Sequence, residues 1–319
     1  MSRRLVLAGA VLALLAAGGA RAQAPSQVID DPQANVIETL VVSAKLPGPA
    51  WWRVSDADTT IYILGAPDGL PKDLAWDRSV LERRLDGAFA VLTPPEWRAG
   101  LLDLPALLKL RGRLKDDGDW AGRSPALAAR LRRAWSGFEP KDADGWKGWK
   151  PLYVAIQLNS KADRRARMET MEPGDTVRGL ARKHHVAARP AEVRKAMPLL
   201  KLLVRDNTDE AGLVCLSETL DTVEAGPASR QAAAQAWAEG RVKAVLAAPR
   251  SAERCQLLLP GVADVKRQSA DDEVAALTKL LETPGHAVAV YPMRGLVAEG
   301  GVLDQLRRRG ITVRTPGDG

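Results

Sequence analysis

The stretch that most suggests chemistry is "GAPDGLP", residues 65–71, which continues the apolar run "TTIYILG". Glycine lets a backbone turn sharply, so we expect Gly65 to close a strand. A tight, polar, proline-containing loop after a strand is a common way to build the lip of an active site. This loop carries Asp68, and a carboxylate can ligate a metal ion. Asp68 is therefore a candidate metal ligand in this loop.

Other catalytic patterns are missing from the sequence. It contains no Gly-rich phosphate loop and no G-x-S-x-G nucleophile elbow. The nearest nucleophiles are Ser79 and Thr93, and neither has a histidine partner in view. The residues thus give no independent sign of an enzyme.

Three histidines are present, and we expect none of them to form a site. His184 and His185 are adjacent on a predicted helix, so their side chains point about 100° apart and chelate one ion poorly. They are expected at a solvated helix end. His286 precedes the last apolar strand, at the end opposite to the one where a loop would carry site residues.

Residues 1–22 have the features of a cleavable signal peptide. Arg3 and Arg4 precede the apolar run "LVLAGAVLALLAAGG", and "ARA", ending at Ala22, is an A-x-A cleavage site. The run is shorter than a bilayer-spanning helix, and no later segment is apolar enough to span. "SRRLVL" resembles a twin-arginine signal, but Val6 replaces the usual aromatic residue, so Sec export stays open. We expect a periplasmic or secreted protein.

The charge argues against a nucleic-acid partner. Loss of residues 1–22 removes three arginines and no acids, so the formal net charge falls from +7 to +4. This charge is small for the length of the chain, and its basic residues alternate with acids as on ordinary solvated helix faces.

The chain has two cysteines, Cys215 and Cys255. In an exported protein, two thiols suggest one disulfide. It would close a loop of about 40 residues and contribute roughly 3–4 kcal/mol in the chain-entropy model. A metal or nucleophilic role is disfavoured, because neither cysteine has a CxxC partner or a nearby histidine.

The periodicity of the apolar residues predicts strands at both ends of the chain and helices between them. Residues 50–65 form a hairpin pattern, and residues 286–292 and 311–315 are strand-like. From Leu101 to about Ala248 the apolar residues recur every three or four positions. We expect an α/β (α+β) fold with a small mixed sheet, made from N- and C-terminal strands, and a large helical insert. The expected organisation is a signal peptide (1–22), a flexible lead-in (23–48) and a single domain (49–319).

The lead-in contains one ordered-looking piece, "ETLVVSA", residues 38–44. It resembles the energy-coupling box at the start of TonB-dependent outer-membrane receptors. An edge strand or a linker segment explains the same residues, because a match of this length is weak.

The order of the segments resembles the TraB/PrgY/GumN family, over nearly the whole mature chain. "PAWWRVSDADTTIYILGAPDGLP" resembles the family's opening, in which a Trp-containing strand, a turn and an apolar strand lead to Gly-x-x-His and Leu-Pro. "HAVAVYPMRGLVAEGGVLDQLRRRGITV" resembles its closing segment, with a second Gly-x-x-His. The resemblance implies metal-dependent hydrolysis, as in relatives such as the Tiki proteases, with strand-end histidines and acids gathering a divalent ion.

The sequence departs from the family pattern at each aligned position. Asp68 stands in place of the first histidine, and "YPMR" has Tyr291 and Arg294 in place of the second glycine and histidine. Thr93 stands in place of the glutamate that ends the next strand in the family pattern. A guanidinium only donates hydrogen bonds and stays charged, so Arg294 cannot ligate a cation. Our hypothesis is that an Asp68–Arg294 salt bridge replaces the metal bridge between the two strand ends.

Three nearby residues complete the candidate set. Glu96 follows Thr93 by three positions, Glu192 lies near the place of a missing family motif, and Arg267, followed by Gln268, is the closest match to an Arg-Asn pair.

Three functions follow from these residues. The leading hypothesis is a non-catalytic periplasmic binding or scaffold protein, with no metal and no other cofactor, whose partner is an envelope protein, a peptide or a glycan. The second is a metal-dependent hydrolase with an Asp-based site. The third is an accessory of TonB-type envelope machinery that uses residues 38–44.

Overall fold

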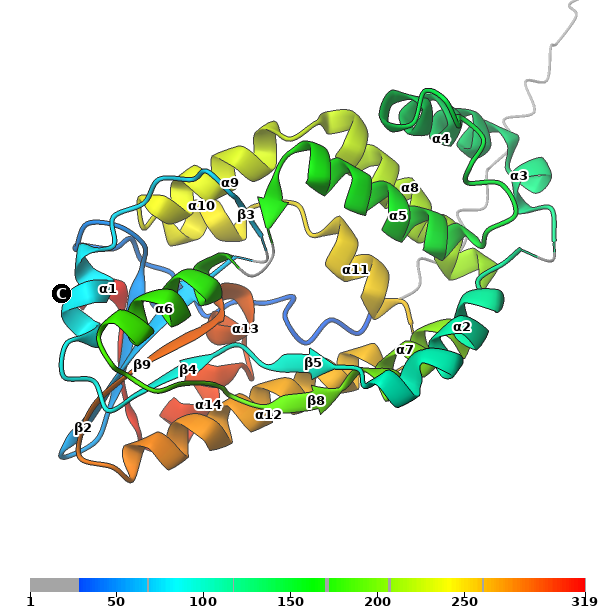
Figure 1. Cartoon of the computed structure of the whole chain (residues 1–319). Coiled ribbons are helices and arrows are strands. Elements are labelled where there is room, and N and C mark those ends of the chain that lie inside the picture. The colour runs from blue at the N-terminus through cyan, green and yellow to red at the C-terminus, as the bar shows by residue number, and fades with distance from the viewer. Residues whose placement is uncertain are drawn as a thin grey trace, which may run out of the picture.

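The computed structural model describes residues 29–67, 69–116, 118–169, 172–205, 208–259 and 261–318. Figure 1 shows a sheet with covering helices at one end of the molecule and a group of helices at the other. Within the described residues, no helix is long and apolar enough to cross a membrane.

The main sheet has the strand order β10-β1-β2-β9-β4-β7. Its first three strands are antiparallel, whereas β2, β9, β4 and β7 are parallel to one another. The strands of this sheet are β1 (Trp51–Ser55), β2 (Thr59–Ala66), β4 (Ala90–Thr93), β7 (Ala188–Pro190), β9 (Gly285–Pro292) and β10 (Thr312–Arg314). The predicted mixed sheet, built from strands near both ends of the chain, is therefore confirmed.

The helical middle is confirmed as well, with an addition that the periodicity did not predict. Three short strands interrupt it: β6 (Met168–Glu169), β7, and β8 (Val193–Lys195). β7 joins the edge of the main sheet, β6 pairs with β3 (Leu70–Pro71), and β8 pairs in parallel with β5 (Glu96–Arg98). The β5–β8 ribbon continues from the ends of β4 and β7 toward the helices.

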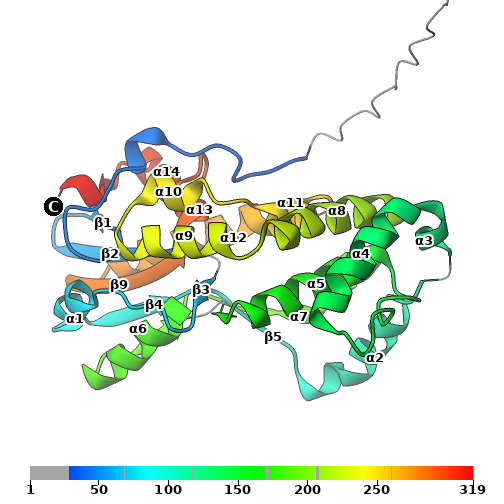
Figure 2. The ribbon, with the colours of Figure 1, turned by 90° about the horizontal axis from the view of Figure 1, so that it is seen from above.

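Helices cover both faces of the sheet (Figure 2). On one face lie α12, α13 and α14, and on the other lie α1 and α6. The helices near the sheet are α1 (Ser79–Leu85), α6 (Glu172–Lys183), α9 (Ala228–Ala238), α10 (Val242–Leu246), α12 (Val262–Leu281), α13 (Met293–Val297) and α14 (Val302–Arg308). The remaining helices are α2 (Leu104–Gly112), α3 (Trp120–Arg123), α4 (Pro125–Phe138), α5 (Pro151–Arg165), α7 (Ala196–Arg205), α8 (Asp209–Ala225) and α11 (Ser251–Leu257).

Two clusters of buried apolar side chains stabilise the molecule. The larger lies around the sheet and includes Trp52, Ile63 and Val290. The smaller lies among α4, α5, α8 and α11. Helix α12 contributes to both, with Val262 in the helical cluster and Leu277 in the sheet cluster. This helix therefore connects the two parts of the molecule.

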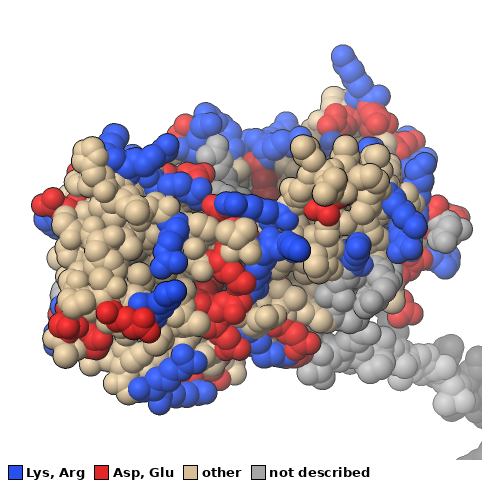
Figure 3. Space-filling view, turned by 60° about the horizontal axis from the view of Figure 1, so that its bottom comes forward, with Lys and Arg blue, Asp and Glu red and all other residues tan. Residues whose placement is uncertain are grey.

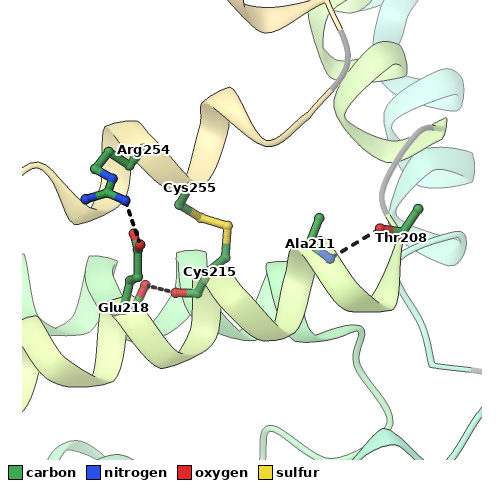
Figure 4. Close-up of a disulfide and its surroundings, with 7 residues drawn as sticks. Thr208, Ala211, Cys215, Glu218, Arg254 and Cys255 are labelled. Carbon is green, nitrogen blue, oxygen red and sulfur yellow. Dashed lines mark hydrogen bonds and ion pairs between the residues drawn. A yellow bond between two sulfur atoms is a disulfide. The ribbon is translucent and has the colours of Figure 1, made fainter. Parts of the chain in front are cut away.

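The predicted disulfide is present. Cys215 on α8 and Cys255 on α11 are bonded, with a sequence separation of 40 residues (Figure 4). Both side chains are buried in the helical cluster.

The described part of the lead-in, residues 29–48, runs over the surface of the fold (Figure 2, blue). It contains a 3-10 helix, Glu38–Leu40, and the Leu40 side chain is fully buried in the sheet cluster. The Trp52 indole N–H donates to the Leu40 carbonyl, at 3.1 Å. The apolar residues of "ETLVVSA" are thus used inside the fold.

Candidate functional site

The ends of β2 and β9 lie side by side, as the segment order predicts. In the parallel register Gly65 is opposite Tyr291, and Ala66 is opposite Pro292. Positions 68 and 294 follow these paired ends by two residues each. Asp68 lies outside the described residues, so the hypothesis of an Asp68–Arg294 salt bridge stays a prediction.

Gly65 has a different physical role from the one expected of it. It lies within β2 and is not among the described glycines with positive φ, so no sharp turn requires it. A Cβ atom at this position would come within 2.5 Å of the Trp52 ring. The Gly65 carbonyl accepts a hydrogen bond from the Trp237 indole N–H, at 2.7 Å. Close packing of the Trp52 ring therefore excludes a side chain here, and the backbone carbonyl is held by Trp237.

Arg294, on α13 directly after β9, is built into the structure through backbone carbonyls. Its half-buried guanidinium donates to the Leu246 carbonyl of α10, and to the Gln33 carbonyl of the lead-in at 3.4 Å. The Gln33 side chain also lies against Gly295, where a Cβ atom would meet its amide nitrogen at 2.9 Å. The lead-in therefore packs over the end of β9 where the resemblance expects a histidine.

A second arginine holds the lead-in at the same place. Arg250 pairs with Asp31 at 2.6 Å and with Glu253 at 2.7 Å, and it also donates to the Gln33 carbonyl. Burial alone would raise the pKa of Asp31, but hydrogen bonds from Arg250 and from a backbone amide lower that pKa overall. The Asp31 carboxylate is therefore stable in its ionised form.

The ends of β4 and β7 bring Thr93, Glu96 and Glu192 together. The Ala191 amide donates to the Thr93 carbonyl, and the Glu96 amide donates to the Glu192 carbonyl, both at 2.9 Å. Thr93 is 1% exposed, and its hydroxyl has no hydrogen-bond partner among the described residues. The structure thus places these three candidates in one region and leaves one buried hydroxyl unsatisfied.

The Glu96 carboxylate is engaged by two arginines. Arg98 lies 2.8 Å away and Arg178 lies 3.2 Å away. The hydrogen bond from Arg98 lowers the pKa of Glu96. A carboxylate held in this way is a poor proton acceptor at neutral pH.

Glu192 belongs to a polar cluster that reaches α12. Arg194 bonds Glu192 at 2.8 Å, and it also pairs with Asp272 and donates to the Ser269 hydroxyl. A hydrogen bond with Asp272 lowers the pKa of Glu192, while burial and that same bond raise the pKa of Asp272. The pKa values of the two carboxyls are therefore shifted in opposite directions, toward the ionised form for Glu192 and toward the protonated form for Asp272.

Glu273, beside this cluster, is the most unusual titratable group of the region. It is 6% exposed, and burial raises its pKa to about 8. The Tyr291 hydroxyl donates to its backbone carbonyl at 3.5 Å. Glu273 was not among the predicted site residues, although its spacing of four residues from Leu277 and seven from Leu280 puts it on the apolar face of the helix.

The observed contacts of Arg267 do not connect it to this polar cluster. It lies on the exposed side of α12, where it pairs with Asp30 at 2.9 Å and with Asp264 at 2.7 Å. His286 is at the start of β9, as expected, where its Nε2 bonds the Arg84 carbonyl at 3.1 Å. Within the described ranges, no group of three or more His, Cys, Asp or Glu side chains is arranged to hold a metal ion.

Two hollows stand out, and both lie away from the strand ends. One is bordered by the lead-in, β1 and the segment after β10. The other lies in the helical part, and its lining includes Trp135, Trp146, Trp149, Tyr153, Gln157 and Lys161. The indole N–H groups of Trp135 and Trp146 donate to nearby carbonyls, each at 3.1 Å. The lining of this aromatic hollow includes four aromatic side chains, of which Trp135 and Trp146 are themselves buried. Aromatic-lined grooves are used to bind proline-rich segments.

Comparison with known proteins gives one match, which covers most of the chain. The model of the TraB/PrgY/gumN family matches residues 50–315. No curated protein and no solved structure gives a significant match.

Proposed function

Because the chain belongs to the TraB/PrgY/gumN family, and because an arginine stands where the resemblance expects a histidine, we propose that it is an exported, non-catalytic member that works by binding. The observation that carries this proposal is the environment of Arg294. Its guanidinium is held by the carbonyls of Leu246 and Gln33. A fixed positive charge at this strand end repels a divalent ion, and the group has no lone pair to offer.

The hydrolase hypothesis has less support from the geometry. Of its candidate residues, Glu96 is neutralised by two arginines and Arg267 is paired with Asp30. The TonB-accessory hypothesis needs "ETLVVSA" as a free strand, yet Leu40 is buried and the Leu40 carbonyl accepts from Trp52. Binding of a partner sheet through this segment would require these contacts to break.

Export is supported by the disulfide, since such bonds persist in oxidising compartments. The predicted signal peptide, residues 1–22, lies outside the described residues.

Metal content tests the non-catalytic proposal. We expect the natural protein to hold no stoichiometric Mn²⁺, Co²⁺ or Zn²⁺ after loading and gel filtration. The double variant Asp68→His, Arg294→His restores the two histidines of the family pattern, and we expect it to take up about one ion per chain, the capacity of a single two-histidine site. Elemental analysis measures both.

The matched control is Asp68→Ala, Arg294→Ala, which removes the same two charges without adding ligands. It should bind no metal, and its melting temperature reports how far loss of the Arg294 contacts disturbs the fold. Stoichiometric metal in the natural protein would overturn the proposal and favour the metal-dependent hydrolase hypothesis instead.

We assign the binding role to the aromatic hollow. Suitable probes are soluble cello- and chito-oligosaccharides and a polyproline peptide, followed by tryptophan fluorescence. We expect at least one probe to bind, and we expect Trp149→Ala to weaken it roughly tenfold, about 1.4 kcal/mol. Trp97→Ala, which removes a 42% exposed tryptophan outside the hollow, is the control. Binding that Trp149→Ala leaves unchanged, or no binding of any probe, would contradict this assignment.

A further inference from the structure

The exposed apolar side chains of this protein are concentrated in one place. Eight large hydrophobic side chains are exposed within the described residues, and five of them lie between residues 97 and 108. These five are Trp97 (42%), Leu101 (94%), Leu102 (97%), Leu104 (56%) and Leu108 (63%). A sixth, Val193, is on β8, opposite Glu96 of β5. We call residues 97–108 the leucine ridge.

The fold does not use these leucines. On α2 the buried residue is Leu110, at the far end of the helix, while Leu104 and Leu108 face outward. Before α2, the adjacent Leu101 and Leu102 in a short 3-10 turn are almost fully exposed. Soluble monomeric proteins rarely expose contiguous apolar patches unless the patch has a partner. The leucine ridge therefore lacks its partner in the isolated chain.

Basic side chains border the ridge. The exposed cations between residues 97 and 115 are Arg98, Lys109, Arg111, Arg113 and Lys115. The described acid within this range is Asp103, whose carboxylate accepts from the Gly100 amide at 2.7 Å. Arg98 is paired with Glu96 at 2.8 Å, and with this acid included residues 96–115 carry a formal net charge of +3. In Figure 3, which brings the lower side of Figure 1 forward, a largely uncharged area at the end that carries α2 has Lys and Arg side chains, and some Asp and Glu, along its border.

We propose that the leucine ridge binds the surface of an anionic lipid bilayer. Protruding leucines insert into the boundary between headgroups and acyl chains, and a basic border attracts anionic headgroups. Lys and Arg place their aliphatic stems along apolar surface while the charged ends stay in the headgroup layer. The charge complementarity favours anionic lipid over an uncharged apolar partner. The bilayer contact uses residues 97–108, which do not line the aromatic hollow. It therefore does not depend on the binding function proposed above.

Co-sedimentation with vesicles tests the proposal on the mature full-length protein. We expect binding to vesicles of equal parts phosphatidylglycerol and phosphatidylcholine, and much weaker binding to phosphatidylcholine alone. Binding should fall when salt shortens the Debye length to about 3 Å. The variant Leu101→Ser, Leu102→Ser removes the two most exposed leucines, and it should bind the anionic vesicles roughly tenfold or more weakly, because buried apolar area drives the insertion.

The control is Ile156→Ser, Val214→Ser, which changes the two exposed hydrophobic residues outside this region. It should bind vesicles like the natural protein. The proposal is overturned if the natural protein does not bind anionic vesicles, or if the two double variants bind equally. It is also overturned if light scattering shows a dimer that Leu101→Ser, Leu102→Ser abolishes, since a second copy would then cover the ridge.

Discussion

Replacing Glu273 by glutamine should stabilise the protein against unfolding at pH 9 by several kcal/mol, while changing its stability at pH 5 by only about 1 kcal/mol. The reason is the burial of this carboxyl on α12, which raises its pKa to about 8 from an ordinary value of 4.5. A pKa difference of one unit corresponds to about 1.4 kcal/mol, so the difference here is worth on the order of 5 kcal/mol. Glutamine has the same shape and cannot ionise.

The sign of the effect follows from proton binding. Between pH 4.5 and pH 8 the folded state keeps a proton on Glu273 that the unfolded state has lost. Folding stability therefore falls as pH rises through this window, and the full penalty is present above pH 8. Below pH 4.5 both states are protonated and the group contributes nothing. The glutamine variant should lack this decline.

The neighbours of Glu273 modify this result without changing its direction. Arg194 on β8 lowers the pKa of Glu273, whereas Asp272 raises it. Glu273 in turn raises the pKa of the buried Tyr291, second to the effect of burial itself. Because Arg194 is already bonded to Glu192 and Asp272, it does not supply Glu273 with a dedicated partner.

Urea unfolding at pH 5, 7 and 9 measures the effect. Glu282→Gln is the matched control, because Glu282 is exposed at the end of the same helix. Its stability should follow the natural protein at each pH. A Glu273→Gln variant that loses stability with rising pH as steeply as the natural protein would show that Glu273 is ionised at little cost.

The sequence predicts the strands of this fold better than it predicts the polar cluster. β2 and β9 are long apolar runs, and their resemblance to a family predicts that they are neighbours, which the register confirms. β7 has three residues and ends in Pro190, so its pattern is that of a loop. It becomes a strand because it pairs with β4 at the edge of the sheet. Glu192 and Arg194 follow it, so their meeting with Asp272 depends on a strand that periodicity does not detect.

Helical periodicity also failed to separate buried from exposed apolar residues. "LPALLKLRGRL" has the spacing of a helix, and α2 is indeed helical, yet its leucines are largely exposed. Spacing shows which residues share a face but not whether another element covers it. The long-range ion pairs were likewise invisible in a single sequence, since Asp31 and Arg250 are 219 residues apart.

Replacing Cys215 and Cys255 together by alanine should lower the free energy of unfolding by roughly 3–4 kcal/mol, because the crosslink restricts a loop of about 40 residues in the unfolded chain. For a protein of this size we expect the melting temperature to fall by about 6–16 °C. Alanine suits both positions, since the Cys215 and Cys255 side chains are buried and a serine hydroxyl there would lack a partner.

Removal of the disulfide should destabilise the helical part of the molecule first. The disulfide ties α8 to α11 inside the smaller apolar cluster (Figure 4). The other contacts drawn there are weaker: the Arg254–Glu218 pair spans 3.7 Å, and Arg254 is about half exposed. The Thr208 hydroxyl accepts from the Ala211 amide within the first turn of α8 and does not link the helices. Hydrogen exchange should therefore show faster opening of α8 and α11 than of β2 and β9.

Reducing agent provides the control for this prediction and connects it to the compartment. Dithiothreitol should lower the melting temperature of the natural protein to that of the alanine variant, and it should leave the variant unchanged. A variant that melts like the oxidised natural protein would show that the crosslink adds no stability. Protein made without residues 1–22 in a reducing cytoplasm should melt at the lower temperature until it is oxidised. Full stability then depends on export, which gives the predicted signal peptide a physical reason.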